Sequence, residues 1–221
     1  VITGEIYPAQ VDVLDGVIVR VRQEMEETLP AASVYDGRGG YLLPGFIDIH
    51  MHVESTMLTP EEFGNAAVLC GTTAVFVDPH EIANVMGIPG VEYMLENGKR
   101  SPVRQFNLAS SCVPSVPGLE GSGAEFGPRE IARMLDMDGV VGIAEVMDCV
   151  GVVNDTERMH GILEEGLRRG VLIQGHAPRV LGKELAAYAL GGPTDNHSGR
   201  SAEECLENLR AGLHVNLQIG R

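Results

Sequence analysis

From residue 41 onward, short apolar runs alternate with amphipathic segments. Short runs rich in Val, Ile, Leu and Ala predict buried strands, and apolar positions three or four residues apart predict helices. The expected strands are residues 46–49, 72–77, 105–109, 140–144, 171–174, 194–197 and 214–219. The expected helices are residues 60–70, 91–97, 128–135, 157–169, 183–190 and 202–211. Capping boxes at Thr59-Pro-Glu-Glu62 and Ser201-Ala-Glu-Glu204 predict the first turn of two of these helices.

The first part of the chain contains strand and turn signals only. Apolar runs at residues 1–3, 10–14, 16–21 and 32–35 predict four strands, and Asp15-Gly16 is a strong hairpin signal. A glycine-rich turn at residues 36–40 follows. We interpret residues 1–42 as the N-terminal part of a small β-sandwich domain, and residues 43–221 as a second domain.

Apolar strands that alternate with amphipathic helices are typical of a parallel sheet covered by helices. A doubly wound sheet and a (β/α)8 barrel share this pattern. Polar residues follow the C-terminal ends of the first, second, fourth, fifth and sixth expected strands. In a barrel these ends meet at one mouth, where barrel enzymes keep their chemistry. We therefore predict an α/β fold, a TIM-like (β/α)8 barrel, and we expect it to be truncated after its seventh strand.

The composition argues against some partners. The formal net charge is −15, whereas a nucleic-acid backbone or an anionic membrane surface requires a positively charged partner. No apolar run approaches the roughly 20 residues of a transmembrane helix, and no signal-peptide pattern opens the chain. The 4 cysteines are scattered without a Cys-x-x-Cys pair, as expected for reduced thiols in a cytoplasmic protein.

Candidate metal ligands stand at strand ends. His50 and His52 are two residues apart, so in extended backbone their side chains project from one face and can close on one metal ion. Alone, such a pair is weak evidence, because histidine also serves as a core or surface residue. Glu145, His176 and His197 follow later strands. Each has an ordinary structural explanation by itself, but the whole set in this order predicts a catalytic site for divalent metal ions.

Longer motifs surround these residues. They are PGFIDIHMHVESTML at 44–58, TTAVFVDPHEIANV at 72–85, SSCVP at 110–114, GIAEVMD at 142–148, GHAP at 175–178 and GKEL at 182–185. Together they resemble the amidohydrolase superfamily and, within it, the bacterial adenine deaminase family. The resemblance covers nearly the whole chain, and DPHEIANV is its most specific part.

The resemblance implies a site with two ions. His50, His52 and Glu145 would hold one, and Glu145, His176 and His197 the other, with Glu145 in the bridging place that a carboxylated lysine holds in other relatives. It also implies a strand-eight aspartate, which would lie beyond Arg221. Two segments depart from the family pattern: Ser198 stands where a glutamate is usual, and residues 218–221 read Gln-Ile-Gly-Arg where an Arg-Glu-Gly-Ser type of run is usual. These departures concern substrate contacts rather than the expected metal ligands.

The activity implied by the resemblance is hydrolytic deamination of adenine to hypoxanthine and ammonia, as in purine salvage. Proton transfer in such a reaction needs groups within hydrogen-bond reach, and the candidates are Glu54, Asp78, His80 and Glu81. Asp78 and Glu81 are read equally well as capping or ion-pair residues. Expected cofactors are two divalent ions, since imidazole and carboxylate suit Mn²⁺, Fe²⁺ and Zn²⁺ alike. Expected partners are adenine, water and a second copy of the chain in a homodimer.

Two other functions stay open at this point. One is a related cyclic amidohydrolase that acts on another heterocycle. The other is a catalytically inactive, metal-binding paralogue, for which Ser198 and Gln218-Ile219 are the only support.

Overall fold

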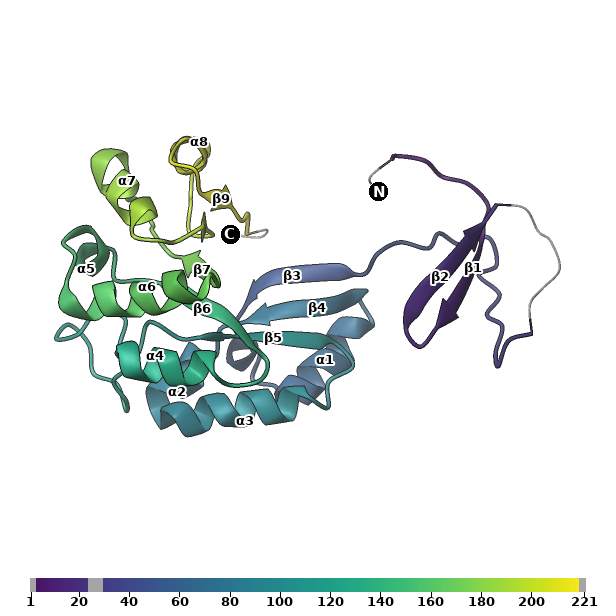
Figure 1. Cartoon of the computed structure of the whole chain (residues 1–221), viewed down its shortest axis with the longest axis horizontal. Helices are drawn as coiled ribbons and strands as arrows, with labels where there is room; N and C mark the ends of the chain where they lie inside the picture. The colour runs from purple at the N-terminus through teal and green to yellow at the C-terminus, as the bar shows by residue number, and fades with distance from the viewer. Residues whose placement is uncertain (1–2, 24–29, 219–221) are drawn as a thin grey trace. The chain divides into compact units, whose positions relative to one another are not determined.

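The computed structural model describes residues 3–23 and 30–218. The chain divides into two compact units, Val1–Pro44 and Gly45–Arg221 (Figure 1). The second unit contains all the candidate site residues, and the first is a small β unit.

The first unit contains an antiparallel hairpin of β1 (Gln10–Leu14) and β2 (Val17–Arg22). Asp15 and Gly16 both have positive φ, at 50° and 77°, as the tight turn of a hairpin requires. The predicted strand at residues 32–35 is wrong, because these residues pair with no strand among those described and the side chain of Tyr35 is 92% exposed. The predicted strand at 1–3 lies mostly outside the described residues. That this unit belongs to a β-sandwich stays a prediction.

The second unit is built on a sheet of five parallel strands. They are β3 (Phe46–Met51), β4 (Thr72–Val77), β5 (Arg104–Ala109), β6 (Val140–Val146) and β7 (Leu172–Gly175), and they lie side by side in chain order. Two very short parallel strands follow, β8 (Asp195–Asn196) and β9 (His214–Val215). The amide of Thr194 donates to the carbonyl of Ile173, which joins the start of β8 to β7.

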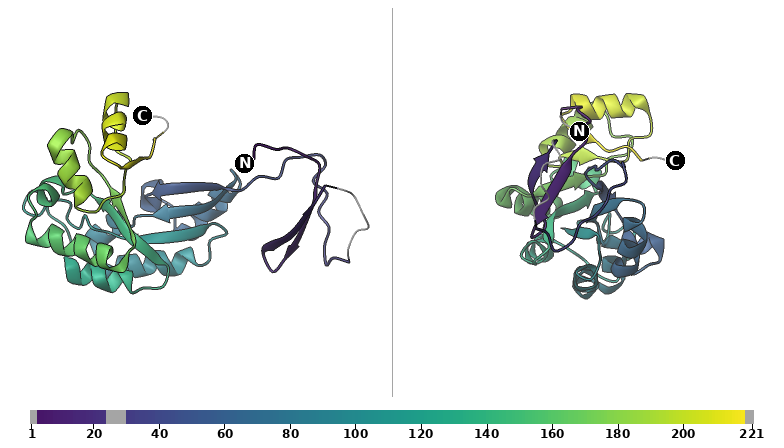
Figure 2. Two further views of the ribbon diagram at one scale, coloured as in Figure 1. Left: turned by 45° about the horizontal axis from the view of Figure 1, so that its top comes forward. Right: turned by 90° about the vertical axis from the view of Figure 1, so that its right-hand side faces the viewer.

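Helices lie between successive strands. They are α1 (Pro60–Val68), α2 (His80–Met86), α3 (Ile88–Gly98), α4 (Pro128–Leu135), α5 (Cys149–Val153), α6 (Glu157–Arg169), α7 (Gly182–Leu190) and α8 (Ala202–Arg210), with a 3-10 turn η1 (Val53–Thr56). Helices α1, α3 and α4 lie along the same face of the sheet (Figures 1 and 2). Chain-order strands with helices on one face form part of a barrel, whereas a doubly wound sheet has helices on both faces. The α/β barrel prediction is confirmed, as an incomplete barrel.

Apolar side chains hold the helices on the sheet. Ile131 and Met134 of α4, Ile162 of α6, and Ile143 and Ile173 of the sheet are all buried in one cluster. Burying one such side chain stabilises the fold by about 1.5–3 kcal/mol. No helix among the described residues is long and apolar enough to cross a membrane.

Strand β3 is more exposed than the sequence predicts. The sequence predicts a buried strand, but Phe46 and Ile47 are 68% and 59% exposed. The physical reason is position: β3 is the edge strand of the five-stranded sheet, so only one side of it is paired. Its register with β4 still brings its C-terminal end, and therefore His50 and His52, next to Asp78.

Candidate metal centre

The C-terminal ends of the strands converge on Glu145. His50 lies in β3 and His52 just after it, Glu145 lies in β6, His176 follows β7, and His197 follows β8. All five side chains that the sequence nominates as metal ligands are brought together, although they come from segments up to 147 residues apart in the numbering (197 − 50). The stacked rings of His50 and His197, with centroids 3.9 Å apart, show how closely the two ends of the site approach.

Glu145 is the centre of this group. Its side chain is nearly fully buried; Oε1 lies 3.3 Å from Nε2 of His52, and Oε2 lies 2.5 Å from Nδ1 of His176 and 3.0 Å from Nε2 of His197. Burial raises the pKa of the Glu145 carboxyl, but the surrounding imidazoles of His176, His197 and His52 outweigh it and hold that pKa well below its usual range. Glu145 is therefore a buried carboxylate anion.

The contacts around Oε2 of Glu145 are not hydrogen bonds. Among the described residues, neither Oε2 of Glu145 nor Nδ1 of His197 has a hydrogen-bond partner, although both atoms are buried. A buried charged oxygen without a hydrogen bond carries a desolvation cost that proteins usually remove. Imidazole nitrogens and a carboxylate oxygen at these distances are the donor set of a divalent metal ion, which would satisfy Oε2 of Glu145 and be bound by Nε2 of His197. The residues present fit such an ion.

Hydrogen bonds through Nδ1 orient the two histidines at the C-terminal end of β3. Nδ1 of His50 donates to Oε1 of Gln174 at 2.9 Å, and Nδ1 of His52 donates to the carbonyl oxygen of Asp78 at 3.1 Å. Because each Nδ1 is the donor, each Nε2 is directed into the site, and the two Nε2 atoms are 3.1 Å apart. Metal-binding histidines are commonly oriented by such a bond through the other ring nitrogen. The sequence gives no signal for this role of Gln174.

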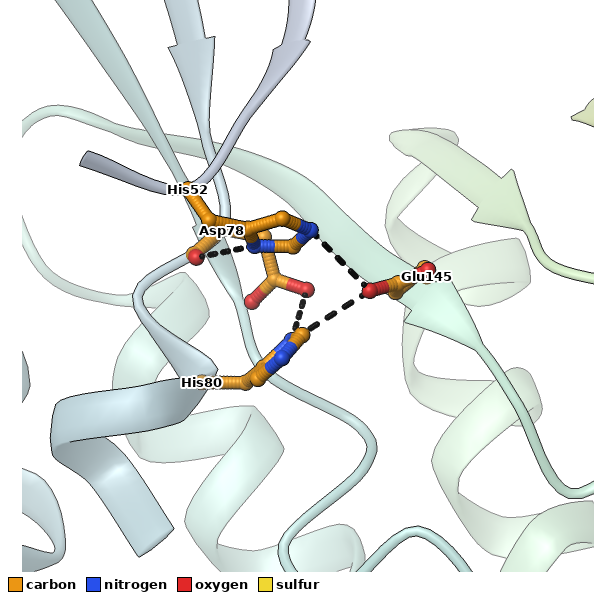
Figure 3. A group of neighbouring side chains, drawn as sticks. All are labelled: His52, Asp78, His80 and Glu145. Carbon is orange, nitrogen blue, oxygen red and sulfur yellow. Dashed lines mark hydrogen bonds and ion pairs between the residues drawn. The ribbon is translucent and has the colours of Figure 1, made fainter. Parts of the chain in front are cut away.

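Asp78 and His80 also reach this centre. Asp78 is fully buried, accepts a hydrogen bond from Ser110 Oγ at 2.8 Å, and lies 2.8 Å from Nδ1 of His80. The same nitrogen of His80 is 3.4 Å from Oε1 of Glu145. Figure 3 shows the imidazoles of His52 and His80 and the carboxylate of Asp78 directed toward one another and toward Glu145. Ser110 thus has a defined partner, which its position after β5 alone did not reveal.

The other two candidates for proton transfer, Glu54 and Glu81, join η1 to the first turn of α2. Glu54 Oε1 accepts a hydrogen bond from the amide of Ile82 at 3.2 Å, and Glu81 Oε1 accepts one from Ser55 Oγ at 2.5 Å. Burial raises the pKa of Glu54, and the charges of Asp78 and Glu81 add to that rise. Its Oε2 is buried without a hydrogen-bond partner among the described residues. Glu54 and Glu81 lie outside the side-chain groups that the described residues form around Glu145.

His176 is positioned by a tyrosine. Its amide donates to Oη of Tyr188 at 2.8 Å, and the same Oη donates to the carbonyl of Val146 at 2.6 Å. Tyr188 is fully buried in α7. This phenol links the end of β6, where Glu145 lies, to the turn that carries His176. The sequence gives no signal for it, because an apolar helix position occupied by tyrosine is ordinary.

Metal binding is expected to release protons. In the metal-free chain burial lowers the pKa of His52, but its contact with Glu145 and the charges of Asp78 and Glu145 raise the pKa to about 9. At pH 7 His52 therefore carries a proton on Nε2, which must leave before that nitrogen can bind an ion. We expect Mn²⁺ affinity to rise up to about tenfold per pH unit between pH 7 and 9. Calorimetry in buffers of different ionisation enthalpy measures the released proton; an affinity independent of pH over this range would contradict the assignment.

The fold and the site define a class of protein: an α/β barrel with histidine and carboxylate ligands at the C-terminal ends of its strands. Residues 41–210 match the model of the amidohydrolase family, and the chain belongs to that family. It is 45% identical to the adenine deaminase of Klebsiella pneumoniae strain 342 over 216 residues, which is 98% of this chain and 36% of that protein. It is 40% identical to the adenine deaminase of Moorella thermoacetica over 221 residues, or 100% of this chain and 37% of that protein. The chain thus spans a little over a third of the length of these relatives.

Solved structures agree on the fold. An amidohydrolase aligns with a TM-score of 0.56 over 92% of this chain and 59% of its own, at 18% identity. A 5-methylcytosine deaminase from Klebsiella pneumoniae, liganded with 5-fluorocytosine, aligns with a TM-score of 0.52 over 96% and 62%, at 14% identity. At these identities the likeness concerns the fold alone.

Proposed function

We propose that this chain carries the metal centre of an adenine deaminase, which hydrolyses adenine to hypoxanthine and ammonia. The observation that supports the chemistry is the buried Glu145 carboxylate, surrounded by His50, His52, His176 and His197 without hydrogen bonds to its Oε2. The support for adenine as substrate is the name of the relatives that match nearly the whole chain.

We further propose that the centre holds two divalent ions, of Mn²⁺, Fe²⁺ or Zn²⁺. The two carboxylate oxygens of Glu145 face different imidazoles, which favours a bridging role. Such ions supply a Lewis acid and lower the pKa of a bound water from 15.7 to about 7.

Deamination at C6 of a purine also requires that a ring nitrogen gain a proton and that the amino group leave as ammonia. Of the four acidic and histidine candidates after β3 and β4, Glu54 suits proton transfer best. Its pKa is raised by burial, and its Oε2 has no hydrogen-bond partner among the described residues. Glu81 accepts a hydrogen bond from Ser55, so we assign it to holding η1 against α2. Asp78 and His80, which touch Glu145, are assigned below.

The setting of the enzyme is part of the same proposal. The thiols of all four cysteines are free, which supports a reducing, cytoplasmic location. The net charge of −15 supports an enzyme that binds neither nucleic acid nor membrane. A homodimer and a place in purine salvage complete the proposal.

The direct test is ammonia release from adenine by the purified protein after loading with Mn²⁺. We expect ammonia and hypoxanthine in equal amounts, and no opening of the rings of hydantoin or dihydroorotate. Ring opening without ammonia release would replace the proposal with a cyclic amidohydrolase. A full load of metal with no turnover of any purine would identify an inactive paralogue.

A further inference from the structure

The two oxygens of Glu145 face two different sets of ligands. Oε2 points to His176 and His197, with Nε2 of His50 at 4.0 Å. Oε1 points the other way, with Nε2 of His52 at 3.3 Å and Nδ1 of His80 at 3.4 Å. The family resemblance pairs His52 with His50, whereas the geometry also groups His52 with the residues that follow β4.

We propose that His52, Asp78, His80 and Glu145 form one complete position for a divalent cation, so that Asp78 and His80 are metal ligands. The inference rests on the metal centre of the proposed function and adds to it two ligands from the Asp-Pro-His-Glu segment. One ligand atom from each of the four residues lies within 4.8 Å of the other three.

The spacing of these atoms suits a metal ion. Ligand atoms at about 2.0–2.2 Å from a divalent ion lie roughly 2.8–3.1 Å from one another in octahedral geometry and roughly 3.3–3.6 Å in tetrahedral geometry. The observed separations are 3.3 Å for His52 to Glu145, 3.4 Å for His80 to Glu145, and 2.8 Å for His80 to Asp78. Each is close to an edge of such a polyhedron.

The charge and burial of the two carboxylates also favour a bound cation. Asp78 and Glu145 are both almost fully buried, and two carboxylates at one position need positive charge between them. Asp78 adds a second negative charge to this position, beside the Glu145 carboxylate that the two proposed ions share.

The surroundings also orient the proposed ligands. Ser110 donates to Oδ1 of Asp78, which leaves Oδ2 on the side of His80. The carbonyl oxygen of Asp78 accepts a hydrogen bond from Nδ1 of His52, which directs Nε2 of His52 toward the proposed cation position. Carboxylate and imidazole ligands held by outer hydrogen bonds are the usual arrangement of protein metal sites. The short α2 begins at His80, so the backbone that carries this ligand is fixed by a helix.

The test is the metal content of His80→Asn and Asp78→Asn proteins, measured by mass spectrometry after loading with Mn²⁺ and by equilibrium titration. His160→Asn is the matched control, because His160 is exposed on α6 and pairs only with Asp155 among the residues described. We expect each site variant to lose one ion per chain, or to bind that ion at least about 10–100-fold more weakly, and the control to match the wild type. Wild-type content and affinity in both site variants would overturn the inference and leave His80 and Asp78 as a hydrogen-bonded pair.

A second measurement covers variants that fail to fold. In the wild-type protein with ¹⁵N-labelled histidine, titration with Zn²⁺ is expected to move the Nδ1 resonance of His80 in step with that of Nε2 of His52. A saturated protein in which the His80 resonance stays in place would overturn the inference. Neither measurement uses adenine, so a protein that behaves as expected here but releases no ammonia would contradict only the proposed function.

Discussion

Replacing Glu145 by glutamine is expected to lower both Mn²⁺ affinity and ammonia release from adenine by at least about 100-fold. The amide has nearly the same shape but no negative charge, and its nitrogen is a donor that cannot bind a cation. In the metal-free protein the same change removes the contact that opposes burial at His52, so the pKa of His52 should fall from about 9. Metal titration, ammonia assay and the histidine pH titration by magnetic resonance measure these effects.

Glu92→Gln is the control for this experiment. Glu92 forms an exposed ion pair with Arg133 on the helical side of the sheet, where such pairs contribute about 0–1 kcal/mol. We expect it to keep wild-type affinity and turnover. A Glu145→Gln protein with normal metal content and normal turnover would show that Glu145 is a structural carboxylate.

Replacing Gly175 by alanine is expected to destabilise the protein by about 1–3 kcal/mol and to reduce its metal content. A Cβ on Gly175 would lie 2.1 Å from the carbonyl oxygen of Asp195, which is backbone and cannot rotate away. The strand β8 must therefore move off β7, and overpacking of this kind typically costs about 1–3 kcal/mol, occasionally more. His176 and His197 directly follow β7 and β8, so a displacement of β8 changes the positions of these two imidazoles around Glu145. Denaturant unfolding and metal analysis measure the two effects.

Gly121→Ala is the matched substitution in open space. No atom lies within 4 Å of a Cβ built on Gly121, and its φ is not positive. We expect its unfolding midpoint to match the wild type. Equal stability of the two alanine variants would contradict the close packing of β7 on β8.

Much of the fold is predictable because hydrophobic periodicity and capping act locally. The bounds of α4 and α6 agree with the prediction, and the hydroxyls of Thr59 and Ser201 cap α1 and α8. The helices α2 and α5 were missed. Each is shorter than two and a half turns, so its apolar pattern is too brief to distinguish from a loop. The last strand was predicted too long: β9 ends at Val215 although residues 216–218 are described.

The site is predictable only in part. The residues at strand ends could be nominated because parallel strands present their C-terminal ends at one edge, and the structure brings these residues together. Gln174 and Tyr188 could not be predicted, because they act through hydrogen bonds to residues far away in the sequence. Gln174 contacts His50, 124 positions away, and Tyr188 contacts Val146, 42 positions away. The grouping of His52 with Asp78 and His80 depends on the register of β3 with β4, which sequence spacing does not contain.

The most direct test of the account is the anomalous scattering of crystals loaded with Mn²⁺. We predict an anomalous peak on each side of Glu145, one within about 2.0–2.3 Å of Oε1 and one within the same distance of Oε2. The first peak should also lie within that distance of His80 Nδ1. A map without a peak at Glu145, with its carboxylate hydrogen-bonded only to histidines, would contradict the metal centre on which the proposed function depends.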